Sequence, residues 1–284
     1  MPTITEKLTE LNNIKTNIKE AIKSKGVVVE DTTPFNQYPS KIGQLSLHLF
    51  NSNTYACSID GSEIDTEEKK SATIQEHCEN AIAAGKTEIF FVFKGEIPRL
   101  IFSNSFTNKF SQFNNSNIQK VSIIFDSQAN IPAVLDGSCM FLECDTLTTI
   151  LRIDTSNVAS MSYMFFRCSS LTSIPHLDTS NVIEMECTFY GCSSLTSIPA
   201  LNVSKVTRLF EIFASCISLE NIDMYRMKVS FSVAGTKLNA ATLNKLFTNL
   251  ATVTTTQTIT ITGTPGAATC DRSIATSKGW TVVG

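Results

Sequence analysis

The sequence has no long apolar run, although its overall composition is apolar. Hydrophobic residues make up 42% of the 284 positions, yet no window approaches the roughly 20 consecutive apolar residues that a membrane-spanning helix needs. The first residues, MPTITEKLTELNN, contain acidic side chains and no apolar segment, unlike a secretory signal. We therefore expect a protein that is made and folded in a reducing cytosol, without membrane insertion.

Charge is also scarce. Asp, Glu, Lys and Arg together make up 17% of the residues, and the formal net charge is -3. The only dense basic stretch, Lys15, Lys19, Lys23 and Lys25, is interpreted as the solvated face of a helix. The sequence therefore predicts no nucleic-acid partner.

Residue arrangements typical of catalysis are missing too. The histidines His48, His77 and His176 are far apart in sequence, and the neighbours His77 and Cys78 fall on a predicted helix. Adjacent helical side chains point about 100° apart, so this pair does not form a nucleophile and its base. No Lys-Ser or Lys-Thr follows the turn at 263–266, and no carboxylate pair for glycan hydrolysis can be placed on one surface. The sequence predicts no enzyme, no catalytic residue, no cofactor and no metal site.

What the sequence does contain is a repeat of 24 residues. Four kinds of residue recur at this interval without a slip, and the turn sequence DTSNV occurs at both 154–158 and 178–182. A fixed period between about 20 and 50 residues is typical of a solenoid, whose units bury their apolar sides by stacking. The four columns are Cys144, Cys168, Cys192 and Cys216; Phe141, Phe165, Phe189 and Phe213; Leu147, Leu171, Leu195 and Leu219; and Ile150, Ile174, Ile198 and Ile222.

Each coil is expected to combine a short strand with a helical stretch. Leu171, Ile174 and Leu177 are predicted to point inward, and Asp178 with Thr179 to form a polar turn that caps the next segment. That segment has apolar residues at helical spacing: Val182, Met185, Phe189 and Cys192.

The nine cysteines are predicted to be reduced. Stacked equivalents point the same way, whereas a disulfide needs two β-carbons that face each other. Cys139 and Cys187 lie two coils apart with Tyr163 between them, so they cannot share a tetrahedral metal ion. The cysteine column is therefore interpreted as small buried packing residues.

The chain divides into four predicted parts: an N-terminal helical anchoring and oligomerisation segment (1–48), an N-terminal cap with degenerate repeats (49–135), the regular repeats (136–230) and a C-terminal cap (231–284). Helices are expected at 67–84, 238–250 and 267–278. Strands are expected at 88–93, 99–102, 121–125, 258–262 and 280–283. A stripe of aromatic residues is interpreted as core: Phe102, Phe106, Phe110 and Phe113.

The predicted N-terminal helix carries an apolar seam about three heptads long. Such a helix is marginal alone in water, so the seam must pack against its own domain or against another copy. Isoleucine in both core rows favours three strands over two in the second case. The seam consists of Ile4, Leu8, Leu11, Ile14, Ile18 and Ile22.

Two stretches resemble known families. The string LNNIKTNIKEAIKSKGVVVEDTTPFNQYPSKIGQL resembles a short N-terminal module of tailed-phage structural proteins, which implies attachment to a virion and adds Phe35 and Tyr38 to the docking residues. The pattern LDTSNVxxMxxxFxxCSSLTSIP over 139–222 resembles the BspA-like branch of the leucine-rich repeats, and the last 27 residues resemble the endings of such proteins. This resemblance implies an α/β leucine-rich-repeat solenoid that acts as an adhesion or protein-interaction surface.

Together these features predict a phage virion structural protein, a fibre or spike subunit presenting its repeats for attachment. Its expected partners are other virion proteins through the N-terminal segment, further copies in a homo-oligomer with a trimer favoured, and a host-surface protein or glycan. The alternative is a bacterial BspA-like adhesin or protein-interaction scaffold. The expected recognition face consists of Thr172, Ser173, His176, Thr196 and Ser197.

Overall fold

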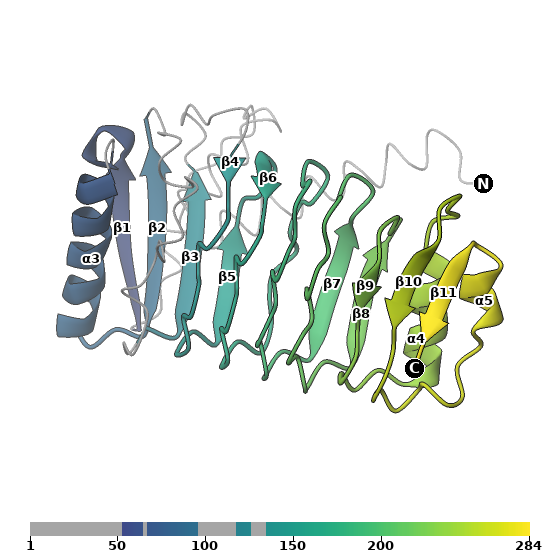
Figure 1. The fold of residues 1–284 in the computed structure, drawn as a ribbon. Helices are drawn as coiled ribbons and strands as arrows, with labels where there is room; N and C mark the ends of the chain where they lie inside the picture. The colour runs from purple at the N-terminus through teal and green to yellow at the C-terminus, as the bar shows by residue number, and fades with distance from the viewer. Residues whose placement is uncertain (1–52, 65–66, 96–117, 126–134) are drawn as a thin grey trace, which may run out of the picture.

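The computed structural model describes residues 53–64, 67–95, 118–125 and 135–284. Figure 1 shows the strands of this part standing side by side in a row, with helix α3 (Glu67–Ala83) at one end and helices α4 (Ala240–Asn249) and α5 (Ser273–Thr276) at the other. Within the described part, no helix is long and apolar enough to cross a membrane.

All strand pairs are parallel, and they form several small sheets. The largest has the order β1-β2-β3-β5, and a second sheet has the order β11-β10-β9. Two more sheets are the pairs β4-β6 and β7-β8. The strands are β1 (Thr54–Asp60), β2 (Glu88–Lys94), β3 (Lys120–Phe125), β4 (Leu135–Asp136), β5 (Thr149–Ile153), β6 (Val158–Ser160), β7 (Ser197–Asn202), β8 (Asn221–Tyr225), β9 (Phe231–Ser232), β10 (Gln257–Thr260) and β11 (Trp280–Val283).

The phenylalanine column forms a continuous stack in the core. Phe141, Phe165, Phe189 and Phe213 are fully buried, and their successive ring centroids lie 5.6, 5.6 and 5.9 Å apart with interplanar angles of 6°, 11° and 5°. The leucine and cysteine columns are buried as well. The isoleucine column is buried except at Ile174, which is half-buried in a coil whose strand segment makes only the isolated bridge between Ser173 and Thr149.

The stretch predicted to be helical in each coil is instead a run of tight turns. In the third regular coil, Cys187 and Gly191 have φ values of 52° and 73°, and left-handed residues at this spacing interrupt a helix. Phe189 N–H donates to the carbonyl of Ile212 in the next coil at 3.1 Å, while Cys192 N–H donates to Phe189 O at 3.1 Å. The prediction was wrong because turns of this size repeat every four residues, which imitates the helical period.

The predicted polar turn is present in successive coils, between the strand segment and the run of tight turns. It does not cap a helix. The side-chain oxygen of Asp178 accepts from Ser180 N–H at 2.9 Å, and the equivalent residues Asp154 and Asn202 do the same. These are side-chain turns of the kind that Asp and Asn favour. They reverse the chain at the same place in successive coils.

Helices occupy the two ends of the row. Helix α3 (Glu67–Ala83) agrees with the prediction at 67–84. Helix α4 (Ala240–Asn249) is capped by Asn239, whose side chain accepts from Thr242 N–H at 3.0 Å. The prediction of a third helix at 267–278 is wrong, because only α5 (Ser273–Thr276) is helical there. At the other end of the row, the short 3-10 helix η2 (Gly61–Ile64) precedes α3.

At the C-terminal end of the row, a lysine donates to carbonyls at the end of α4. Lys278 Nζ donates to the carbonyl oxygens of Phe247 at 3.3 Å and Leu250 at 2.9 Å, and also to Thr248 O. The Phe247 carbonyl also accepts the N–H of the C-cap residue Leu250 at 3.2 Å, and the cation matches the negative end of the helix dipole. The predicted strand at 280–283 is β11, whose Trp280 indole N–H donates to Ala251 O at 2.8 Å.

Several predictions fall outside the described residues. These are the N-terminal segment 1–48 with its seam and docking residues, the strand at 99–102, and the aromatic stripe from Phe102 to Phe113.

We predict that the inward leucine column carries much of the stability of the repeats. Leu195 is fully buried and its neighbour Thr196 is exposed. Replacing a buried leucine by alanine costs about 2 to 5 kcal/mol. Leu195→Ala should therefore lower the unfolding midpoint in urea strongly, whereas Thr196→Ala should hardly change it. Equal effects at the two positions would contradict the register described above.

A second prediction uses two threonines at equivalent positions. Thr155 Oγ1 donates to Asp178 O at 3.0 Å, whereas the buried Oγ1 of Thr179 has no partner in the described part of the chain. A buried hydroxyl without a partner costs about 1 to 3 kcal/mol, and the next coil has Val203 at this position. Thr179→Val should raise the free energy of unfolding by about 1 kcal/mol and Thr155→Val should lower it by a similar amount, measured by urea denaturation. The opposite order would show that the Thr179 hydroxyl is satisfied in solution.

Candidate functional site

The residues predicted to form a recognition face lie on the strand side of successive coils. Thr172 and Ser173 occupy the same places in one coil as Thr196 and Ser197 do in the next, and all four are exposed, as is His176. The structure therefore brings the predicted residues onto one surface, which we call the strand face.

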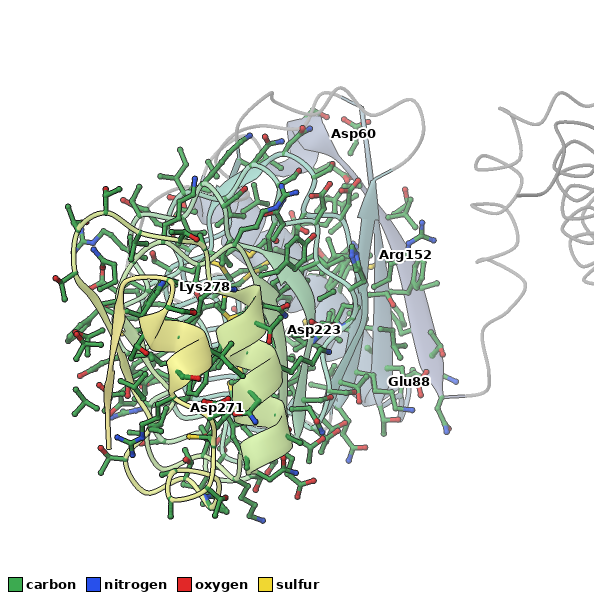
Figure 2. All side chains as sticks on the ribbon, turned by 90° about the vertical axis from the view of Figure 1, so that its right-hand side faces the viewer. Asp60, Glu88, Arg152, Asp223, Asp271 and Lys278 are labelled. Carbon is green, nitrogen blue, oxygen red and sulfur yellow. The ribbon has the colours of Figure 1, made fainter. Side chains whose placement is uncertain are left out.

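The hydroxyls of the strand face are not all available to a ligand. Thr172 Oγ1 donates to Thr148 O at 3.1 Å, and Thr148 Oγ1 donates to Gln119 O at 3.0 Å. These two side chains reinforce the contact between coils. The exposed apolar residue Leu151 also belongs to this side, one strand position before Arg152. Figure 2 shows Arg152 and Glu88 on the same side of the row.

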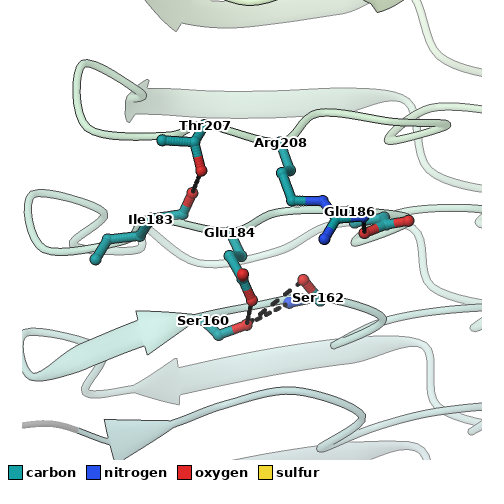
Figure 3. A network of polar contacts seen from close by, with 7 residues as sticks. All are labelled: Ser160, Ser162, Ile183, Glu184, Glu186, Thr207 and Arg208. Atoms are coloured by element: carbon teal, nitrogen blue, oxygen red, sulfur yellow. Dashed lines mark hydrogen bonds and ion pairs between the residues drawn. The ribbon is translucent and has the colours of Figure 1, made fainter.

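A second exposed surface lies on the opposite segment of the coils, where the tight turns begin. Figure 3 shows its polar contacts. Ser160 Oγ lies 3.4 Å from Glu184 Oε2 and 3.4 Å from Ser162 Oγ. We call this surface the turn face. It consists of the residues drawn in Figure 3, which are Ser160, Ser162, Ile183, Glu184, Glu186, Thr207 and Arg208, together with Phe210 and Glu211, which follow Arg208 in the chain.

The main chain holds neighbouring coils of the turn face in register. Glu184 forms isolated parallel bridges with Ser160 on one side and Arg208 on the other. Thr207 donates to Ile183 O through its amide at 2.8 Å and its hydroxyl at 3.3 Å. The side chains of this face are thus presented from backbone positions fixed by hydrogen bonds.

Ion pairs link successive coils on this side. Arg208 Nη2 lies 3.1 Å from Glu186 Oε2, and Arg167 Nη1 lies 3.3 Å from Glu143 Oε1. Both arginine side chains are 60% exposed, so each pair contributes little to stability. Their effect is to orient charge on the surface.

Half-buried aromatic rings extend the surface along the turns. The rings of Phe166 and Tyr190 stack at 4.8 Å between centroids with an interplanar angle of 17°. Tyr163 lies tilted against Phe166 at 5.6 Å, and the guanidinium of Arg167 lies 5.2 Å from the centre of the Phe166 ring. Aromatic rings and arginine together are typical of protein-binding surfaces.

The cysteines offer no activated thiol on either face. Cys168, Cys192 and Cys216 donate from Sγ to the phenylalanine carbonyl of the preceding coil at 2.9, 3.1 and 2.9 Å. Burial raises the pKa of each of these thiols, to about 12 for Cys216. A raised pKa lowers the fraction of reactive thiolate.

No group of three or more His, Cys, Asp or Glu side chains that could hold a metal ion occurs among the described residues. What the two faces offer is an ordered set of hydroxyls, charges and rings, which suits binding. The absence of enzymatic activity stays a prediction.

Sequence reasoning missed the turn face, and no repeat signal could have found it. Its positions do not repeat: Ser160, Glu184 and Arg208 occupy one column, and Ser162, Glu186 and Phe210 another. A search for constant columns finds the core and passes over the columns that vary.

Comparison with known proteins gives one match. A family described as a Mycoplasma protein of unknown function, DUF285, matches residues 99–225 and 135–252, which together cover more than half of the chain. Neither a curated protein nor a solved structure matches.

We predict that the thiol column resists alkylation in the folded chain. A pKa raised from 9.0 to about 12 corresponds to roughly a thousandfold less thiolate for Cys216 at pH 8. Iodoacetamide at this pH should modify the half-buried Cys270 first, and Cys168, Cys192 and Cys216 only after unfolding in guanidinium. Mass spectrometry of the unfolded chain should count nine modified cysteines. Rapid labelling of Cys216 in the native chain, or fewer than nine sites without reductant, would contradict this.

Proposed function

The chain belongs to the DUF285 family, described as mycoplasma proteins of unknown function. Since the family name gives no function, we propose one from the chain itself: a binding protein that serves as a phage virion structural subunit, in a fibre or spike, and presents a leucine-rich-repeat solenoid for attachment. The observation that carries the binding role is the contrast between repeating inward columns and exposed outward columns that vary. A coil held by its backbone and its core leaves its outer side chains free to suit a partner.

The hydrogen bonds between coils support this role. They involve main-chain groups such as Met161 N–H to Glu184 O at 2.8 Å and Met185 N–H to Arg208 O at 3.1 Å. Because these bonds do not depend on the side chain, Glu184 and Arg208 can change without loss of the coil. Surfaces built in this way recur in repeat proteins that bind macromolecules.

The placement on a virion rests on the N-terminal resemblance. In this proposal the seam from Ile4 to Ile22, with Phe35 and Tyr38, joins copies to one another or to other virion proteins. The repeats then face outward, toward a host-surface protein or glycan.

A second candidate is a bacterial adhesin or interaction scaffold. The observation that favours it is the family description, which refers to mycoplasma proteins and not to virions. The two candidates share the binding surface and differ in what carries it. A mass-spectrometric inventory of purified phage particles separates them, because only the first requires the chain to be present.

We predict that residues 1 to 45 serve assembly and are not needed for the fold of the repeats. The described strands begin at Thr54, so deleting this segment should leave the circular dichroism spectrum and the unfolding midpoint of the remaining chain unchanged. Incorporation into particles should be lost, or a trimer should become a monomer in analytical ultracentrifugation.

The matched control replaces the strand-face residues Thr172, Ser173, His176, Thr196 and Ser197 by alanine in the full chain. These changes should preserve assembly and weaken attachment to the host. If the deletion unfolds the repeats and incorporation survives, the division into an assembling segment and a binding surface is wrong.

A further inference from the structure

Two exposed apolar side chains flank the polar residues of the turn face. Ile183 and Phe210 are 47% and 60% exposed, respectively. They lie on adjacent coils, since Thr207 N–H donates to Ile183 O at 2.8 Å and Phe210 follows three residues later. Single exposed apolar residues are ordinary, but two of them around one set of polar groups indicate a contact surface.

The polar groups beside these two residues carry unbalanced negative charge. Arg208 is paired with Glu186 at 3.1 Å. Glu184 has only the neutral hydroxyl of Ser160 near its carboxylate, at 3.4 Å, and Glu211 is exposed directly beside Phe210. Within the described part of the chain, neither Glu184 nor Glu211 has a cationic partner, so the surface keeps two negative charges next to its apolar side chains.

Burial and the carboxylates of the turn face raise the pKa of two neighbouring groups, Cys187 and Tyr163. The pKa of Cys187 is raised first by burial and then by the charges of Glu211 and Glu186. The pKa of Tyr163 is raised to about 12, first by burial and then by nearby groups that include Glu186. Two carboxylates of the turn face, Glu186 and Glu211, are therefore close enough to act on the same buried thiol, Cys187.

We propose that the turn face binds a basic segment of a protein partner, with arginine or lysine side chains paired to Glu184 and Glu211 and lying along Ile183 and the ring of Phe210. This deepens the proposed binding role and rests on it. Arginine suits both features, because its guanidinium pairs with carboxylates and lies over aromatic rings while its stem covers apolar surface. The contact of Arg167 with Phe166 is an example within the chain itself.

The experiment measures binding of a fluorescein-labelled oligo-arginine peptide to the purified full chain by fluorescence anisotropy. The double variant Glu184→Gln with Glu211→Gln should weaken binding by about tenfold, and Phe210→Ala by about threefold. Added salt should weaken binding to the unaltered chain more than to the double variant. Phe210 and Glu211 are exposed and Glu184 is half-buried, and circular dichroism checks that each variant is folded.

Matched controls come from the strand face. Glu220→Gln removes an exposed acid, and Leu151→Ala removes an apolar side chain that is 51% exposed. Both should change the affinity by less than about twofold, since neither lies on the turn face. If Glu220→Gln weakens binding as much as the double variant does, the attraction is general and the proposal is overturned. It is also overturned if an oligo-glutamate peptide binds as well as the oligo-arginine peptide. A third overturning result is that the turn-face variants lose binding of a neutral oligosaccharide and keep binding of the oligo-arginine peptide.

Failure of this proposal is distinguishable from failure of the proposed function. The peptide assay uses the isolated chain and needs no particle or host. Absence of the chain from particles, with peptide binding intact, would overturn the virion role alone. If the chain is incorporated into particles and supports attachment normally, and the turn-face variants do not change peptide binding, only the proposal of a basic protein partner is overturned.

Discussion

The hydrogen bond between the main chains of successive coils is the interaction on which the rest of this structure depends. In the turn runs it joins residues 23 positions apart, from Phe141 N–H to Met164 O, from Phe165 N–H to Thr188 O and from Phe189 N–H to Ile212 O. Every such bond needs a neighbouring coil, so one coil alone leaves its donors and acceptors open. Since unpaired buried backbone groups are costly, the coils are stable only as a stack.

Buried polar side chains inside the stack also form hydrogen bonds to main-chain carbonyls of the neighbouring coil. Cys192 Sγ donates to Phe165 O at 3.1 Å, and Thr188, which replaces a methionine of the preceding coils, donates to Met161 O at 3.0 Å. Both polar groups are buried and both use a carbonyl one coil away. Among the described residues, the same kind of hydroxyl on Thr179 has no hydrogen-bond partner. A polar atom in this core is thus tolerated where the adjacent coil supplies a carbonyl, which explains why cysteine can fill a whole column without disulfides or metal.

Periodicity predicted what repeats and missed what varies. The columns of phenylalanine, leucine and cysteine were predicted as core and are buried, and α3, β2 and β11 lie where local patterns placed them. The helical stretch in each coil was wrong because residues such as Tyr163 and Arg167 adopt left-handed φ values of 59° and 56°, a conformation that sequence spacing does not reveal. The strand face was predicted from its hydroxyls. The turn face needed coordinates, because the proximity of Glu184, Arg208 and Phe210 follows from stacking.

The separation of core and surface also explains what a family match can say about this chain. The matched residues, 99–252, include the phenylalanine, leucine and cysteine columns that the stack buries. The outward positions carry Ser160, Glu184 and Arg208 in a single column, so neighbouring coils differ in charge while their backbones bond alike. Mutations at these positions therefore leave the main-chain bonds between coils in place. The family match therefore bears on the stacked scaffold, whereas the binding role proposed above depends on the exposed columns of this chain.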